Sequence, residues 1–264
     1  MAIFDKKRDL IIDLTLFIYP FQKDLVGFPK VCRWNHTEGA RLNSIPSGID
    51  PEDFPDGKSQ AWEEVTITTH LGTHIDAPWH LYPTSEGKPS KTIDQVPLDW
   101  CIGNGVILDL TDKEAKHLIT KEDIVKALDK IHYTIKLGDI VLIRTDYDKK
   151  WPKKEYFESH LGMGRESTLY LLDQGVKVIG IDGFGFDRPF KAMGEDYRRT
   201  KDKNVIWPAH NVGKDREYLH IERLANLDKV PVPYGFTFIG APIVIEGASA
   251  GWIRAMALVE KDKL

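Results

Sequence analysis

Apolar residues recur along the chain in short runs that are typical of β-strands. The runs are rich in β-branched and aliphatic residues and are separated by segments that contain Gly, Pro, Asn or Asp. They fall at residues 10–14, 65–69, 106–110, 140–144, 176–181, 236–245 and 252–259. The pattern predicts a strand at each of these places.

Two segments between these runs have the features of helices. Residues 120–123 (Thr-Lys-Glu-Asp) begin the first, because threonine favours an N-cap and acidic residues favour a first turn. Its apolar stripe is formed by Ile124, Ala127, Leu128 and Ile131. The second helix is expected over residues 166–174, with Gly175 placed to end it. A helix followed by a strand, twice over, predicts an α/β fold with a mixed β-sheet.

Two long stretches, residues 23–60 and 184–217, are rich in Gly, Pro, Asn and charged residues. They are longer than usual connections, so we interpret them as functional loops around a pocket. The chain has no internal repeat and no obvious linker, and its 264 residues suffice for one large domain or at most two small ones. We expect a single domain over residues 1–264.

Composition and charge exclude several function classes. With 36 Lys and Arg against 40 Asp and Glu, the formal charge of −4 argues against a nucleic-acid surface. No apolar run approaches the roughly 18 residues of a membrane span. The start of the chain is charged where a secretory peptide would be apolar. Cys32 and Cys101 form no CxxC motif. We therefore expect a cytoplasmic protein.

Three histidines and an aspartate fall within residues 70–80, His-Leu-Gly-Thr-His-Ile-Asp-Ala-Pro-Trp-His. In a straight strand His70 and His74 would lie about 13 Å apart, too far to share an ion. Gly72 permits a sharp bend, so a strand that ends in a turn here would let these histidines and Asp76 converge. Neutral imidazoles and a carboxylate suit zinc, manganese or iron(II). The segment predicts a divalent-metal site.

His80 stands apart from the other three candidate residues. Six residues and Pro78 separate it from His74, so it is a candidate for a further ligand or for a free acid/base group. Thr73 and Trp79 are interpreted as supporting or packing residues.

The segment contains every defined position of the pattern HxGTHxDxPxH, and so it resembles the cyclase family of metal-dependent hydrolases. This family includes bacterial-type kynurenine formamidases and isatin hydrolases. The resemblance continues at residues 13–15, 141–145, 180–182, 238–247 and 254–255. It implies a fold of the swivelling β/β/α type, a small-molecule substrate, and a homodimer or homotetramer.

By this resemblance His70, His74 and Asp76 are metal ligands, and His80 is the catalytic acid/base residue. Of the metals that suit these ligands, we expect zinc or manganese.

Formamidase-type members add a distant histidine and, twelve residues later, a glutamate that complete a two-metal site. His210 and Glu222 have this spacing, which makes them further candidate ligands. Without the resemblance, His210 would be interpreted as a loop histidine and Glu222 as a solvated helix carboxylate. His220 is a rival to His210.

The family's aromatic substrate contact near the N-terminus is approximated by Tyr19-Pro20 and by Phe28-Pro29, of which Phe28 is our candidate. The length of the chain and of its loops is more like that of isatin hydrolases, whose pocket holds a cyclic amide. Some members of that kind use one metal, so the resemblance implies one or two ions per chain.

These features predict a metal-dependent hydrolase that cleaves a small amide, formamide or cyclic amide C–N bond. A lactonase or another carbonyl cyclase at the same site is an alternative, as is a metal-loaded protein that only binds a small molecule. His80 separates these classes, because a binding protein needs no unligated imidazole beside its metal.

Overall fold

The computed structural model describes residues 4–18 and 29–263, and the chain divides into two compact units. The larger unit comprises Met1–Phe17 and Thr69–Leu264, and the smaller comprises Ile18–Thr68. The expectation of a single domain over residues 1–264 stays a prediction.

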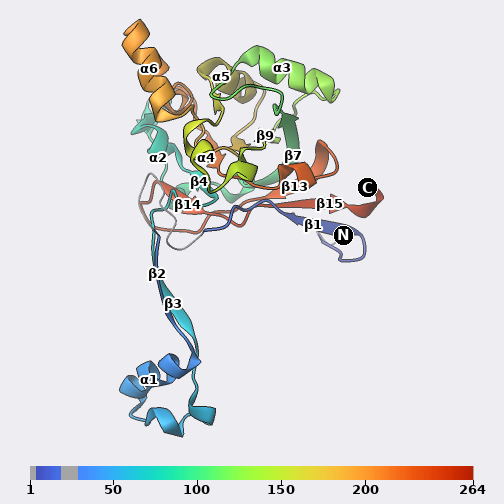
Figure 1. Cartoon of the computed structure of the whole chain (residues 1–264). Coiled ribbons are helices and arrows are strands. Elements are labelled where there is room, and N and C mark those ends of the chain that lie inside the picture. Colours follow the sequence, from blue (N-terminus) through green and yellow to red (C-terminus); the bar gives the residue numbers. More distant parts are fainter. Residues whose placement is uncertain (1–3, 19–28, 264) are drawn as a thin grey trace. The chain divides into compact units, whose positions relative to one another are not determined.

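A nine-stranded mixed sheet forms the centre of the larger unit (Figure 1). Its order is β1 (Asp9–Asp13), β15 (Met256–Glu260), β13 (Tyr234–Ile239), β7 (Ile102–Asp109), β9 (Ile140–Arg144), β11 (Val178–Ile181), β12 (Leu219–Glu222), β4 (His74–Asp76) and β14 (Ala250–Trp252). The strands from β7 to β12 run parallel, and every other neighbouring pair is antiparallel. Because β1 pairs with β15, the two ends of the chain lie side by side.

Helices α3 (Lys121–Lys130) and α5 (Arg165–Asp173) lie on one side of this sheet (Figure 1). Thr120 caps α3 as expected, and its hydroxyl accepts the backbone N–H of Asp123.

The central strands of the sheet are buried on both faces. In β9, Val141 and Ile143 belong to one apolar core and Ile140 and Leu142 to the other. Such two-sided burial explains why the parallel strands read as continuous apolar runs.

The remaining elements of the larger unit are short or peripheral. They are α2 (Pro78–Leu81), α4 (Lys154–Glu158), α6 (Phe190–Thr200), and the strand pairs β5–β6 (Thr84–Ser85, Lys88–Pro89) and β8–β10 (Leu118–Ile119, Gly162–Met163). No helix within residues 4–18 and 29–263 is both long enough and apolar enough to cross a membrane.

The predicted α/β fold with a mixed sheet is confirmed, although several predicted elements differ. The run at residues 236–245 forms a strand only as far as Ile239, and the run at 252–259 divides between β14 and β15. The strand expected at 65–69 lies earlier, as β3 (Trp62–Thr66), and belongs to the smaller unit. All five of its residues are exposed, so the apolar run there does not mark a core.

The two stretches interpreted as loops each contain a helix. Residues 184–217 include α6, whose amphipathic pattern is obscured by its many charged residues. Residues 23–60 include α1 (His36–Ser47), which begins at a capping box formed by Asn35 and Glu38 and ends at Gly48 in the left-handed region. Both signals are present in the sequence, but Pro46 obscures the end of this helix.

The smaller unit consists of α1 and the antiparallel pair β2 (Lys30–Trp34) and β3. Gly39 in α1 is required by a close approach, because a Cβ atom there would lie 1.9 Å from the carbonyl oxygen of Gln60. In the described part of this unit, Pro29, Gly39 and Ala40 are the only buried residues. Burial within the unit therefore contributes little to its stability.

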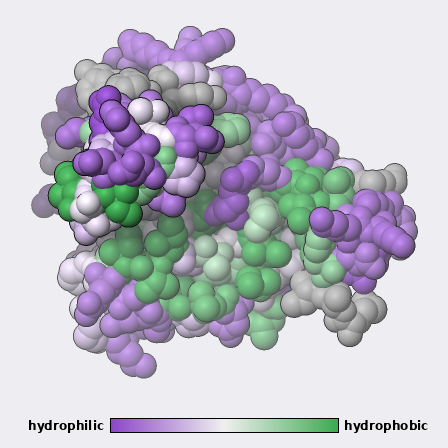
Figure 2. Space-filling model, turned by 90° about the horizontal axis from the view of Figure 1, so that it is seen from below, coloured by the Kyte–Doolittle hydropathy of each residue, from purple (hydrophilic) through white to green (hydrophobic). Residues whose placement is uncertain are grey.

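Apolar side chains are also exposed on the larger unit. They include Leu10, Ile11, Phe17, Ile102, Ile243 and Val244. Figure 2 shows apolar residues gathered over part of the face turned toward the viewer.

Candidate metal centre

The histidine-rich segment bends before it enters the sheet. Residues 69–73 form turns and bends, and Gly72 adopts a φ of 71°, in the left-handed region that favours glycine. The bend expected at Gly72 is thus present. The candidate ligands nevertheless sit differently from the expectation, because His74 and Asp76 lie on a strand that begins after the bend.

The register of the sheet brings distant candidates together. β4 runs antiparallel to β12, with His74 opposite Glu222 and Asp76 opposite His220. Alternate residues of a strand point to the same face of the sheet. These four side chains therefore gather on one face, while Ile75 between them is buried in the core of the other face.

The predicted ligands His70 and His74 converge on one carboxylate oxygen of the third, Asp76. Asp76 Oδ1 lies 2.8 Å from His70 Nδ1 and 3.5 Å from His74 Nε2. Ligand atoms bound at about 2.0–2.2 Å to one ion have separations of this size. Asp76 Oδ1 and His74 Nε2 are buried and make no hydrogen bond within the described part of the chain. Buried polar atoms rarely lack a hydrogen-bond partner, and a divalent ion would bind both of these atoms. The residues therefore fit such an ion.

The electrostatics of His74 and Asp76 also suit ligation. Burial lowers the pKa of His74, so this imidazole is neutral. Burial alone would raise the pKa of Asp76, but the imidazoles of His80, His74 and His220 outweigh it and hold the pKa well below 3.8. A neutral imidazole and an ionised carboxylate are the forms that bind metal.

Neighbouring groups fix the orientation of the ligands. His74 Nδ1 donates to the carbonyl oxygen of Gly72 at 2.8 Å, and His70 Nε2 lies 3.0 Å from Ser249 Oγ. Thr73 has the expected supporting role, because its hydroxyl donates to the carbonyl oxygen of Arg223 at 2.5 Å. Such contacts set the tautomer and ring orientation of ligating histidines.

His80 lies at the open side of the cluster. It belongs to α2 and is exposed to solvent, and its ring centroid lies 4.1 Å from that of His70 and 5.5 Å from that of His210. Desolvation by the packed side of the site lowers the pKa of His80 to about 4, against the opposing effect of Asp76. His80 is thus an accessible imidazole in its neutral form at pH 7, the form that a general base requires.

His210 and Glu222 both enter the site. Together with Asp76 and His220, each offers one ligand atom within 4.8 Å of the others. Glu222 lies in β12 and is buried, so its interpretation as a solvated helix carboxylate is wrong. Its Oε1 accepts the backbone N–H of Phe186 at 2.8 Å, and its Oε2 lies 3.7 Å from His74 Nε2.

The chain matches a known protein family. A family model described as "Putative cyclase" matches residues 12–188. The chain belongs to the cyclase family. The predicted resemblance is therefore confirmed.

Two curated relatives resemble this cyclase-family chain. It is 29% identical to isatin hydrolase from Roseibium aggregatum over 215 residues, which cover 78% of each chain. It is 25% identical to kynurenine formamidase from Salinibacter ruber over 250 residues, which cover 93% of this chain and 96% of the relative.

Solved structures share the fold. An isatin hydrolase bound to the product analogue thioisatinate superposes with a TM-score of 0.74, covers 97% of this chain and 94% of its own, and is 23% identical. Isatin hydrolase A from Ralstonia solanacearum superposes with a TM-score of 0.73, covers 96% and 92%, and is 24% identical.

Three groups of the site, each in contact with a histidine or a carboxylate of the cluster, were not identified from the sequence. Asp187 accepts the backbone N–H of Ala209 and of His210, at 2.8 and 3.1 Å, and pairs with His210 Nδ1. The backbone N–H of Phe186 donates to Glu222, and the hydroxyl of Ser249 lies 3.0 Å from Nε2 of His70. No spacing in the sequence marks them, because their partners are distant in the chain.

The predicted substrate contact lies outside the described residues. The candidate substrate contact Phe28 belongs to the undescribed residues, as does Tyr19.

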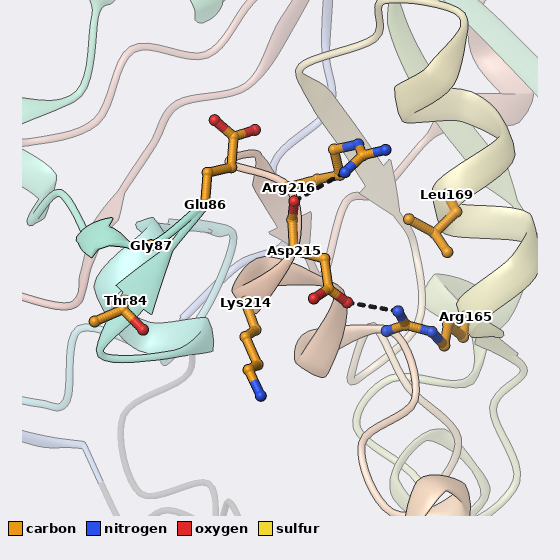
Figure 3. A pocket seen from close by; sticks show the side chains of 8 residues that line it. All are labelled: Thr84, Glu86, Gly87, Arg165, Leu169, Lys214, Asp215 and Arg216. Atoms are coloured by element: carbon orange, nitrogen blue, oxygen red, sulfur yellow. Dashed lines mark hydrogen bonds and ion pairs between the residues drawn. The ribbon is translucent and has the colours of Figure 1, made fainter.

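A surface cavity of about 590 Å³ lies away from the histidine cluster, beside α5 (Figure 3). Two of its charged side chains, Arg165 and Asp215, pair at 2.5 Å, and none of the site histidines lines it.

Proposed function

We propose that this cyclase-family protein is a metal-dependent hydrolase that cleaves a small amide, formamide or cyclic amide C–N bond. One observation carries the proposal. Two buried ligand atoms, His74 Nε2 and Asp76 Oδ1, make no hydrogen bond in the described chain, and the neutral imidazole of His80 opens to solvent beside them.

The names of the relatives support the type of bond. Isatin hydrolase acts on a cyclic amide and kynurenine formamidase on a formamide, and both resemble this chain over most of its length. The two activities share hydrolysis of a C–N bond at a carbonyl carbon. Because the sequence identities are 29% and 25%, the proposal names this class of bond and no single substrate.

Each residue of the cluster has a role in the proposal. His70, His74 and Asp76 would hold zinc or manganese, and Gly72 and Ser249 would keep the two imidazoles in place. A bound divalent ion supplies Lewis acidity and a water-derived nucleophile at neutral pH.

Proton transfer is assigned to His80. Its imidazole is neutral at pH 7, so it can accept a proton from the attacking water and then donate it to the leaving nitrogen. Its exposure gives it access to a substrate that enters from solvent. One ring nitrogen of His80 lies within 4.8 Å of ligand atoms of His70 and Asp76, so the proposal places this proton carrier directly beside the ion.

The proposal is tested by a turnover screen of metal-loaded protein against N-formyl aromatic amines, isatin-like rings, cyclic imides and lactones. We expect turnover of at least one C–N substrate, and loss of it when the metal is removed. Turnover of lactones alone would contradict the assigned bond. Tight binding without turnover of any compound would identify a binding protein and contradict the enzymatic function.

A further inference from the structure

The two carboxylate oxygens of Asp76 face different partners. Oδ1 lies toward His70 and His74 and makes no hydrogen bond within the described chain. Oδ2 lies 2.7 Å from Nε2 of His220, an imidazole that is completely buried. A second ion that shared Asp76 with the first would need Oδ2 as its ligand. The state of His220 therefore bears on the number of ions that the chain can hold.

The surroundings of His220 assign its proton to Nε2. Its Nδ1 is buried and has no hydrogen-bond partner among the described residues. Ligation through Nε2 would place the proton on Nδ1 and leave a buried N–H without an acceptor, at a cost of about 1–3 kcal/mol. With the proton on Nε2, His220 donates to an ionised carboxylate, and only a lone pair at Nδ1 is unpaired.

The other two buried histidines of the cluster show the opposite arrangement. His74 Nδ1 donates to the carbonyl oxygen of Gly72, and His210 Nδ1 pairs with Asp187. In both residues the proton is held at Nδ1, so Nε2 carries the lone pair that an ion requires. His220 has no such acceptor at Nδ1. The comparison separates His220, as a donor to Asp76, from the two imidazoles that are prepared as ligands.

Packing holds His220 in this position. Its ring stacks on that of Phe186, with centroids 4.3 Å apart and an interplanar angle of 14°. Its backbone lies in β12, paired with Asp76 across the sheet. Rotation of the ring out of its plane would therefore lose this stacking contact.

We infer that His220 is a positioning residue that occupies Oδ2 of Asp76 and thereby limits the chain to one divalent ion. Asp76, His210, His220 and Glu222 each offer one atom within 4.8 Å of the others, so a second ion would fit among them only if His220 gave up its hydrogen bond to Oδ2. The inference rests on the metal site of the proposed function, and it adds the number of ions and the residue that sets it.

The test counts ions in chelator-treated protein that has been dialysed against excess Mn²⁺. Elemental analysis gives the number of ions per chain, and electron paramagnetic resonance distinguishes an isolated Mn²⁺ from a coupled pair. For the wild type we expect one ion per chain and an uncoupled spectrum. His220→Ala frees Oδ2, so it should take a second ion and show a coupled spectrum.

Two control variants sharpen the comparison. His220→Gln retains an N–H donor at a similar reach, so it should stay at one ion per chain. His160→Ala removes another buried histidine, whose Nδ1 hydrogen-bonds to the carbonyl oxygen of Leu161, and it should also stay at one ion. Circular dichroism and thermal unfolding show whether each variant is folded. If His220→Ala does not fold, the wild-type count and His220→Gln decide the matter.

Two results would overturn the inference. A wild type with two coupled ions that falls to one in His220→Ala would make His220 a ligand. A folded His220→Ala variant that stays at one ion would show that another feature sets the number. The proposed function fails separately: protein with one ion and no hydrolytic turnover contradicts only the function, and active protein with two ions contradicts only this inference.

Discussion

The side chain of His74 is central to the proposed metal site, because it is buried and its Nδ1 is held by Gly72. His74→Ala should lose most of the bound zinc or manganese, as measured by elemental analysis of protein prepared without chelator. His132→Asn is a matched control, because His132 is exposed and asparagine tolerates its positive φ of 52°. Normal metal content in His74→Ala would show that the ligand assignment is wrong.

The side chain of His80 has a different proposed role, that of proton transfer. His80→Ala should lower turnover by about 10²–10⁴-fold, the usual contribution of a general acid–base group, and should leave the bound metal nearly unchanged. Metal content and turnover are measured on the same preparation. If metal and activity fall together, His80 is a ligand, and if turnover is unchanged, it has no part in the reaction.

At the scale of elements, the first turn of α3 combines a capping box with a charge cluster. Asp123 accepts the backbone N–H of Thr120 at 2.9 Å, and contacts His117 at 2.7 Å and Lys113 at 2.9 Å. Burial acts to raise the pKa of Asp123, but these contacts outweigh it and hold the pKa well below 3.8. The ionised carboxylate is therefore favoured in the folded state.

This lowered pKa has a defined consequence for stability. The contribution of Asp123 should be present above pH 4, where the unfolded chain is also ionised, and should be lost as the pH falls below that value. Asp123→Asn should lower the free energy of unfolding by about 1–3 kcal/mol at pH 7 and reduce its slope below pH 4. Urea unfolding between pH 2 and 7 measures both quantities. An unchanged slope in the variant would contradict the role of Asp123.

The arrangement of the strands explains which parts of the site could be predicted from the sequence. The segment containing His70, His74 and Asp76 is local, so its spacing and Gly72 reveal it. The arrangement of β12 beside β4 is a long-range pairing that no local pattern encodes. Only the resemblance to formamidases pointed to Glu222. The hydrogen bond from His220 to Asp76 depends on that same pairing, and so it became visible only in the structure.

At the scale of the whole molecule, the strands of the sheet centre were predictable because two-sided burial makes them continuous apolar runs. Residues 29–68 were not, because they form helix and strand with little apolar burial. In that segment capping and close backbone approach, such as that at Gly39, determine local structure. Hydrophobic periodicity carries no signal for such contacts.

The exposed apolar side chains bear on assembly. Ile11, Phe17, Ile102 and Val244 are exposed on the larger unit, and exposed apolar patches commonly mark protein interfaces. Together with the family resemblance, they lead us to predict a homodimer or homotetramer, in which some of this surface is buried. Light scattering coupled to size-exclusion chromatography gives the mass in solution. A mass of 30.1 kDa at all concentrations would contradict the prediction.

The central claim is that the cluster around Asp76 hydrolyses a C–N bond with the help of a divalent ion. Its most direct test is mass spectrometry of the products formed in ¹⁸O-labelled water by metal-loaded, chelator-treated and reloaded protein. We predict that the best amide, formamide or cyclic amide substrate gains one water, with one labelled oxygen in the new carboxylate, only when metal is present. Equal product formation by chelator-treated protein, or no labelled product from any C–N substrate, would contradict the claim.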